Sequence, residues 1–277
     1  MLLLRQNKPI TDARRGFTLV EMLVVAPIAI LSIAAIVALS ISVVGDALIS
    51  QDRATTAYTI QESLDRIEQD VRVSNSFLTG YSNLLAGQGK NATSTLMTDT
   101  TAFTATTNGT VTDTLILDQT ATTSDPFDSS RTLVYYNSQP YTCGASSAHL
   151  NRTLQAPVIY FLRNDNDGNG NVLWRRVIVP IWNTNAGASM DADSVCAAPW
   201  QRDTCPKVNA NCQAVDEKLI NNVTAFTLAY YTATGTSVAD GSSANSVKIL
   251  LTTTKTIAGA STTSSGTLRV TRINEGP

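Results

Sequence analysis

The hydrophobic positions of this chain are concentrated near its N-terminus. An almost unbroken apolar run extends from Phe17 to Val44, and Glu21 is the only charged residue within it. As a helix, the uncharged part from Met22 to Val44 would span roughly 34 Å, at about 1.5 Å per residue. A bilayer core is about 30 Å thick. The pattern therefore predicts a helix that crosses a membrane.

Further along the chain the apolar residues take up a helical spacing. Ile60, Leu64, Ile67 and Val71 recur at three- and four-residue steps, and polar or charged residues lie between them. This spacing is typical of an amphipathic helix that buries one stripe of side chains.

Together the two patterns predict one long helix over residues 17–78. Its membrane part covers about 17–45, and its amphipathic part covers about 46–78. Gly80 is a plausible stop signal for this helix.

The remaining residues, 79–277, predict a β-rich headgroup. Residues 79–110 are low in charge and rich in Thr, Asn, Gly and Ala, so we expect a loop or variable insertion there. Seven later segments mix β-branched and aromatic residues between turn formers. They are Asp113–Asp118, Arg131–Asn137, Val158–Arg163, Val172–Val179, Val223–Thr232, Ser246–Thr254 and Thr267–Ile273. The predicted fold class is α+β, in which the C-terminal half of the long hydrophobic helix packs on a mainly antiparallel β-sheet.

The charges predict how the chain sits in a membrane. Charged residues make up 15% of the sequence and the formal net charge is -2, which argues against broad electrostatic binding of nucleic acid. Arg5, Lys8, Arg14 and Arg15 precede the apolar run. The positive-inside rule then predicts a single-pass protein of the plasma (inner) membrane, with a cytoplasmic N-terminus and an extracytoplasmic headgroup.

Two simpler interpretations of the apolar run are a secretory signal peptide and a plain signal anchor. A signal peptide has a shorter apolar core and a small-residue cleavage site beyond it. The apolar run of this chain is longer, and no small-residue cleavage site of this kind follows it. A signal anchor needs only hydrophobicity, and it leaves unexplained why Glu21 lies in a membrane-entering helix, at a cost on the order of a few kcal/mol.

The segment RRGFTLVE at residues 14–21, followed by Met22–Val25, resembles the class III leader junction of type IV pilins and pseudopilins. The resemblance implies that residues 1–16 are a leader peptide. A prepilin peptidase would cut between Gly16 and Phe17 and N-methylate Phe17. It also implies that Glu21 pairs with the α-amino group of a neighbouring subunit during assembly, which would relieve the cost of a buried carboxylate.

The same resemblance implies a structural role, as a minor subunit of a type IV pilus or a related pseudopilus. The length of 277 residues is long for an abundant major pilin, and Leu64–Arg72 resembles the helix of larger minor pilins and J-type pseudopilins. The implied partners are other pilin subunits, the prepilin peptidase and the pilus assembly platform in the membrane, before display in a pilus at the cell surface. The alternative function is an anchored adhesin or DNA-binding module, although the charge does not favour nucleic acid as a partner.

Four cysteines indicate disulfide bonds. They are Cys143, Cys196, Cys205 and Cys212, and no Cys-x-x-Cys pair is formed. Zinc sites use tighter ligand pairs or more histidines. An even number of cysteines beyond a membrane segment therefore predicts two disulfides in an oxidising compartment, with three pairings open and buried free thiols as the alternative. The segment of about 183–217 would be a disulfide-bonded loop, either an insertion or a contact surface.

An Asn- and Asp-rich segment at residues 164–171 leaves two interpretations open. Asp165, Asp167 and Asn169 match the opening of a calcium-binding loop, but Arg176 stands where an EF-hand needs a glutamate. A simple β-hairpin turn explains the same residues, because Asn, Asp and Gly tolerate positive φ. The turn is favoured, and calcium is the one cofactor that the sequence suggests.

The sequence contains no recognisable catalytic constellation. Its only histidine, His149, lies in a Ser- and Ala-rich stretch without an associated nucleophile motif. Neither a G-x-x-x-x-G-K loop nor a G-x-S-x-G motif is present. We therefore expect the chain not to be an enzyme.

Overall fold

The computed structural model describes residues 18–105, 111–112, 114–136, 153–164, 168, 170–179, 195–257 and 259–273. The chain divides into two compact units, Met1–Gln51 and Asp52–Pro277. The single helix of the described residues, α1 (Leu19–Val73), contributes its first part to one unit and its last part to the other.

In the first unit, the side chains of α1 are exposed and predominantly apolar. Leu19 is 83% exposed, Leu23 is 70% exposed and Ile41 is 68% exposed. Within the described part of the chain, α1 is the one helix long and apolar enough to cross a membrane, a criterion that an N-terminal signal sequence also meets. The helix continues through Pro27.

In the second unit, α1 buries the apolar stripe predicted from the sequence. Ile60, Leu64, Ile67 and Val71 are each at most 3% exposed and belong to the main hydrophobic core of the headgroup. The four side chains share this core cluster with residues of the β-rich part, and a helix with mainly antiparallel sheets is consistent with the expected α+β class.

The helix ends at Val73, before the position 78 expected from the sequence. The backbone N–H and the hydroxyl of Ser74 both donate to the carbonyl of Val71. The next residues form strand β1 (Ser76–Phe77), whose Phe77 pairs with Leu117. Pairing with the sheet therefore competes with helix continuation well before Gly80.

The first sheet has the strand order β1-β5-β6-β7-β10, and all its neighbours are antiparallel. Its longer strands are β5 (Thr114–Asp118), β6 (Val158–Asn164), β7 (Asn171–Val177) and β10 (Glu217–Ile220). All the described residues of β5 are buried except the last, which explains why this strand reads as a nearly continuous apolar run.

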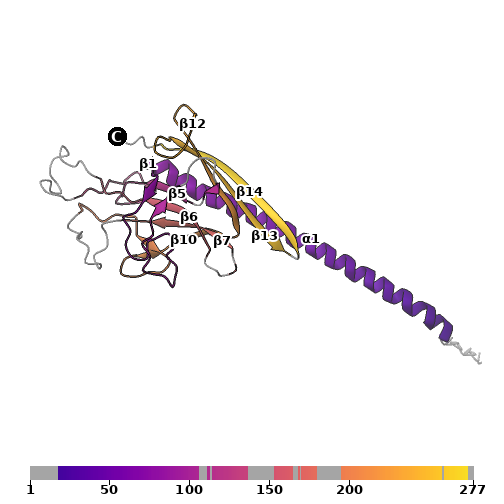
Figure 1. The fold of residues 1–277 in the computed structure, drawn as a ribbon. Helices are drawn as coiled ribbons and strands as arrows, with labels where there is room; N and C mark the ends of the chain where they lie inside the picture. The colour runs from indigo at the N-terminus through magenta and orange to yellow at the C-terminus, as the bar shows by residue number, and fades with distance from the viewer. Residues whose placement is uncertain are drawn as a thin grey trace, which may run out of the picture. The chain divides into compact units, whose positions relative to one another are not determined.

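The second sheet has the order β12-β11-β13-β14, and β4 (Val111–Thr112) also pairs with β11. Its strands are β11 (Val223–Tyr231), β12 (Ser237–Val238), β13 (Ser246–Ile257) and β14 (Ala260–Thr271). β13 and β14 form a hairpin with twelve register pairs, from Ser246↔Thr271 to Ile257↔Ala260. Figure 1 shows this hairpin running alongside the part of α1 that belongs to the headgroup.

Two small strand pairs complete the headgroup. β2 (Gly80–Tyr81) pairs with β3 (Phe103–Thr104), and β8 (Thr204–Cys205) pairs in parallel with β9 (Ala214–Val215). The first pair brings the described part of the expected loop region, residues 79–105, back onto the first sheet, because Phe103 packs in a second core cluster with residues of β5, β6 and β7.

Six of the seven predicted strands are present, with shifted ends, as β5, β6, β7, β11, β13 and β14. The seventh prediction, Arg131–Asn137, is wrong for the described residues 131–136. Leu133, Tyr135 and Tyr136 make only isolated bridges there, to three different segments. Strand β10 was not predicted, because it has only four residues and its first two, Glu217 and Lys218, are both charged, so no alternation of apolar and polar residues is evident.

Candidate functional site

The start of α1 forms a reciprocal hydrogen-bonded cap that involves Glu21. The backbone N–H and the hydroxyl of Thr18 donate to Glu21 Oε2, at 2.9 and 3.0 Å, and the backbone N–H of Glu21 donates to Thr18 Oγ1 at 3.3 Å. This is a capping box, in which a Thr at the N-cap and a Glu three residues later satisfy each other's donors. The Thr-x-x-Glu spacing of Thr18 and Glu21 is the sequence signal for this cap. The processing residues Gly16 and Phe17 lie outside the described residues.

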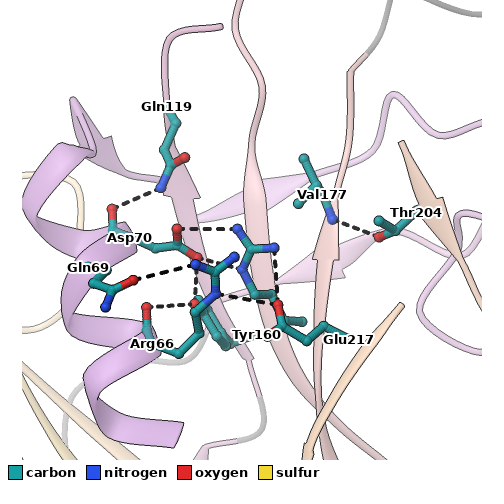
Figure 2. A network of polar contacts seen from close by, with 9 residues as sticks. Arg66, Gln69, Asp70, Gln119, Tyr160, Val177, Thr204 and Glu217 are labelled. Carbon is teal, nitrogen blue, oxygen red and sulfur yellow. Dashed lines mark hydrogen bonds and ion pairs between the residues drawn. The ribbon is translucent and has the colours of Figure 1, made fainter. Parts of the chain in front are cut away.

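A polar network joins the amphipathic part of α1 to the first sheet (Figure 2). Asp70, which is 5% exposed, receives hydrogen bonds from Arg175 Nε at 2.6 Å and from Arg175 Nη2 at 3.2 Å. The hydroxyl of Tyr160 donates to the same carboxylate at 2.5 Å. The side-chain amide of Gln119 donates to the backbone carbonyl of Asp70 at 2.9 Å.

The sheet register explains how residues distant in sequence meet in this network. Tyr160 on β6 and Glu217 on β10 are both register partners of Arg175 on β7, so the three form a row across neighbouring strands. α1 supplies Asp70 and, four residues earlier, Arg66, which share one helix face. Both arginines approach Glu217 Oε2 at 3.4 Å.

The electrostatics of the network favour a fixed set of charges. Burial opposes ionisation of Asp70, but the positive charges of Arg175 and Arg66 and the Tyr160 hydrogen bond hold its pKa below the usual value. Burial and the neighbouring Asp70 charge raise the pKa of Tyr160, so the phenol remains a hydrogen-bond donor. The network thus contains paired charges and no activated nucleophile, which is the arrangement of a structural contact.

The next residue of β7, Arg176, points to the opposite face of the sheet, as side chains alternate along a strand. Arg176 is fully buried and pairs with Asp216 through two hydrogen bonds, of 3.0 and 2.5 Å. Its Nη1 also donates to the backbone carbonyls of Gln88 and Gly89, both at 2.7 Å. This pair therefore fastens the segment between β2 and β3 to the sheet.

Two open grooves flank the polar network, and Arg66 lines both of them. The helix groove, of about 440 Å³, lies between α1 and β10, and its charged lining residues are Glu62, Asp65, Arg66, Glu217 and Lys218. The arginine groove, of about 410 Å³, is lined by Arg66, Arg175, Val177, Trp200, Gln201, Arg202 and Thr204.

The cysteines are oxidised. Cys205 pairs with Cys212, with a Cα–Cα distance of 5.7 Å, and Cys196 is also disulfide-bonded. The predicted disulfides are thus confirmed for these three residues, and free thiols are excluded for them. Cys143 lies outside the described residues, as does His149.

The Asn- and Asp-rich segment connects β6 to β7, since Asn164 and Asn171 are register partners at the end of this hairpin. Gly168 and Gly170 have φ values of 82° and 63°, as the turn interpretation requires. The calcium candidates Asp165, Asp167 and Asn169 lie outside the described residues. Among the residues that are described, no group of three or more His, Cys, Asp or Glu side chains could hold a metal ion.

Comparison of the chain with protein-family models, with curated proteins and with solved structures finds no match.

Proposed function

We propose that this chain is a structural minor subunit of a type IV pilus or a related pseudopilus, assembled through its N-terminal helix. The observation that carries the proposal is the composition of α1. Its first part exposes an apolar surface with one acid near its start, and its last part buries a stripe in a β-rich headgroup. The leader-like segment at residues 14–21 runs into the first turn of this helix, which begins at Leu19.

In this proposal the apolar part of α1 first anchors the precursor in the plasma membrane, with the N-terminus in the cytoplasm. A prepilin peptidase cuts between Gly16 and Phe17 and methylates the new N-terminus. The assembly platform then transfers the subunit from the bilayer into the filament, at or near its tip. The exposed apolar side chains of α1 exchange lipid for the helices of other pilin subunits, which keeps these side chains out of water after the subunit leaves the bilayer.

Glu21 has two roles in this scheme that can be separated. As the third residue of the helix it completes the capping box with Thr18, which needs a side-chain acceptor but no charge. As a subunit contact it neutralises the α-amino group of a neighbour, which needs the negative charge.

The test compares Glu21→Gln with Glu21→Ala in the native cell. Glutamine retains the acceptor of a capping box and removes the charge, whereas alanine removes both. Membrane-bound and sheared filament fractions are quantified with an antibody against the headgroup. We expect both variants to reach the membrane at normal levels and both to be depleted from the filaments by about tenfold or more. Normal incorporation of Glu21→Gln would show that only the cap matters and would refute charge pairing as the assembly contact.

A further inference from the structure

The arginine groove has an electrostatic composition unlike that of the rest of the headgroup. Its lining carries three guanidinium groups, from Arg66, Arg175 and Arg202, and no carboxylate. The acids bonded to these arginines are Asp70 and Glu217. The three lining guanidinium groups outnumber the two carboxylates bonded to them, in a chain whose formal net charge is -2.

Hydrogen-bonding capacity remains available in the arginine groove. Glu217 lies 3.4 Å from both Arg66 and Arg175, which is long for a charge-assisted hydrogen bond. Arg202 is exposed, and within the described parts of the chain no ion pair joins it to an acid. A guanidinium has five N–H donors and binds a carboxylate in a fork geometry. A carboxylate that enters the groove could therefore accept hydrogen bonds from Arg202, next to Arg66 and Arg175, which already contact Glu217.

The segment that forms one wall of the groove is held in place before any ligand binds. Gln201 is 6% exposed, and it accepts a hydrogen bond from the backbone N–H of Thr122 at 3.0 Å and donates to Thr122 Oγ1 at 3.1 Å. Thr204 Oγ1 accepts from the backbone N–H of Val177 at 2.9 Å. Disulfide-bonded cysteines stand on both sides of the wall, at positions 196 and 205. Less conformational entropy is lost when a ligand binds to such a pre-organised wall.

Trp200 adds an apolar surface to the basic one. Its side chain lines the arginine groove and the residue is 49% exposed, although tryptophan is among the residues that are highly buried on average. Tryptophan and arginine are the residue types that most often dominate the energy of protein interfaces. The groove thus offers a ring and a guanidinium two positions apart on one rigid segment.

We infer that the arginine groove binds an acidic segment of a partner protein, in which a carboxylate engages Arg202 and an adjacent apolar side chain packs on Trp200. The volume of about 410 Å³ accommodates one or two side chains. A nucleic acid fits less well, because the positive charge is confined to one groove of about 410 Å³ and does not follow a continuous line of phosphates. This inference concerns the headgroup surface and does not depend on filament assembly.

The test measures binding of a fluorescent peptide to the full chain in detergent micelles by fluorescence anisotropy. The probe is a hexapeptide of alternating Glu and Leu, and the matched probe has Gln in place of each Glu. We expect the Glu peptide to bind at least about tenfold more tightly than the Gln peptide, with an affinity that falls as salt is added.

Charge-reversal variants provide the matched control. Arg202→Glu should weaken binding of the Glu peptide by at least about tenfold. Lys207→Glu changes the same charge at an exposed position on the other side of β8, outside the groove, and should leave binding within about twofold. Trp200→Ala should weaken binding of both peptides. The inference is overturned if the Glu peptide does not bind, if the Gln peptide binds equally well, if both charge reversals act alike, or if a single-stranded oligothymidine binds more tightly than the Glu peptide.

Discussion

Asp70 on α1 and Arg175 on β7 form a two-point ion pair that joins the helix to the first sheet, with N–O distances of 2.6 and 3.2 Å. The pair is largely buried, since the side chains of Asp70 and Arg175 are 7% and 12% exposed. Tyr160 fills a further acceptor site of the same carboxylate. A buried pair of this kind contributes modestly while intact, but removing one member leaves an uncompensated charge.

Arg175→Ala should therefore lower the free energy of unfolding of the headgroup by about 3–5 kcal/mol. The full chain in detergent micelles is unfolded with denaturant and followed by near-ultraviolet circular dichroism. Arg202→Ala is the matched control, and as an exposed arginine it should change stability by at most about 0.5 kcal/mol. Equal effects of the two substitutions would contradict a stabilising role for the pair.

The same pair predicts a pH dependence. The pKa of Asp70 is lowered in the folded headgroup, so the contribution of its charge is present above about pH 4 and is lost as pH falls through the folded pKa. The stability difference between the wild type and Arg175→Ala should therefore shrink in strongly acidic buffer. A difference that stays constant down to about pH 2 would argue that the loss comes from packing alone.

Ionisation of Asp203 should destabilise the folded headgroup, whereas ionisation of Asp70 stabilises it. Burial raises its pKa to about 7, although the carboxylate accepts the backbone N–H of Val179. An unfolded aspartate titrates near about pH 4, so the folded headgroup loses stability between about pH 4 and pH 7, and the loss is constant above that. Asp203→Asn retains an acceptor and cannot ionise. Its stability relative to the wild type should rise across this window, by about 1.4 kcal/mol per unit of pKa difference, or a few kcal/mol in all.

Thermal unfolding at about pH 4 and about pH 8 measures this effect, and Asp240→Asn is its control. Asp240 is partly exposed, and hydrogen bonds from the side chain and the backbone of Ser242 lower its pKa. Its stabilising contribution is present above about pH 4, so the control substitution should lose stability relative to the wild type as pH rises. If Asp203→Asn and Asp240→Asn responded to pH in the same direction, the assignment of Asp203 would be wrong.

Gly266 on β14 allows the close approach of α1 to the second sheet. A Cβ at this position would lie 2.5 Å from Ile60 Cγ2 and 2.9 Å from Leu64 Cδ1, inside the core. Gly266→Ala should therefore lower the free energy of unfolding by about 1–3 kcal/mol, as overpacking does. Ser265→Ala, one position away and exposed, is the control and should stay within about 0.5 kcal/mol. A neutral Gly266→Ala would mean that the helix does not pack on this strand as described.

The disulfides can be mapped directly. Cys205 and Cys212 pair with each other and Cys196 is also oxidised, so Cys143 is the only cysteine left in the sequence as an intramolecular partner. Peptide mass spectrometry without reduction should find the linked pairs 205–212 and 143–196. A 196–205 link, or a free thiol at Cys143, would contradict this expectation. Loss of the short 205–212 loop by Cys212→Ser should cost about 2–3 kcal/mol.

Periodicity and local composition were sufficient to predict much of the fold. The buried stripe of α1 follows from the spacing of Ile60, Leu64, Ile67 and Val71, because a helix repeats at a fixed interval. Six strands follow from runs of β-branched and aromatic residues between turn formers. Leu133 to Tyr136 carry the residues of a strand, yet they make bridges to three segments, since pairing depends on partners that the sequence does not place.

The polar network was not predictable from sequence for the same reason. Asp70, Tyr160, Arg175 and Glu217 are spread over more than a hundred positions, and only the register of β6, β7 and β10 brings them together. The arginine groove also depends on where Trp200 and Arg202 fold back against β7. The capping box of Thr18 and Glu21, by contrast, is local, and its spacing alone could have revealed it.

The most direct test of the proposed function is mass spectrometry of the intact chain and its N-terminal peptide, taken from membranes and from sheared surface filaments of the native cell. The account predicts a mature chain that begins at N-methylated Phe17 and is present in the sheared fraction. A chain that still begins at Met1 and remains in the membrane would contradict it, and the protein would then be an anchored β-rich domain that does not use the junction at Gly16 and Phe17.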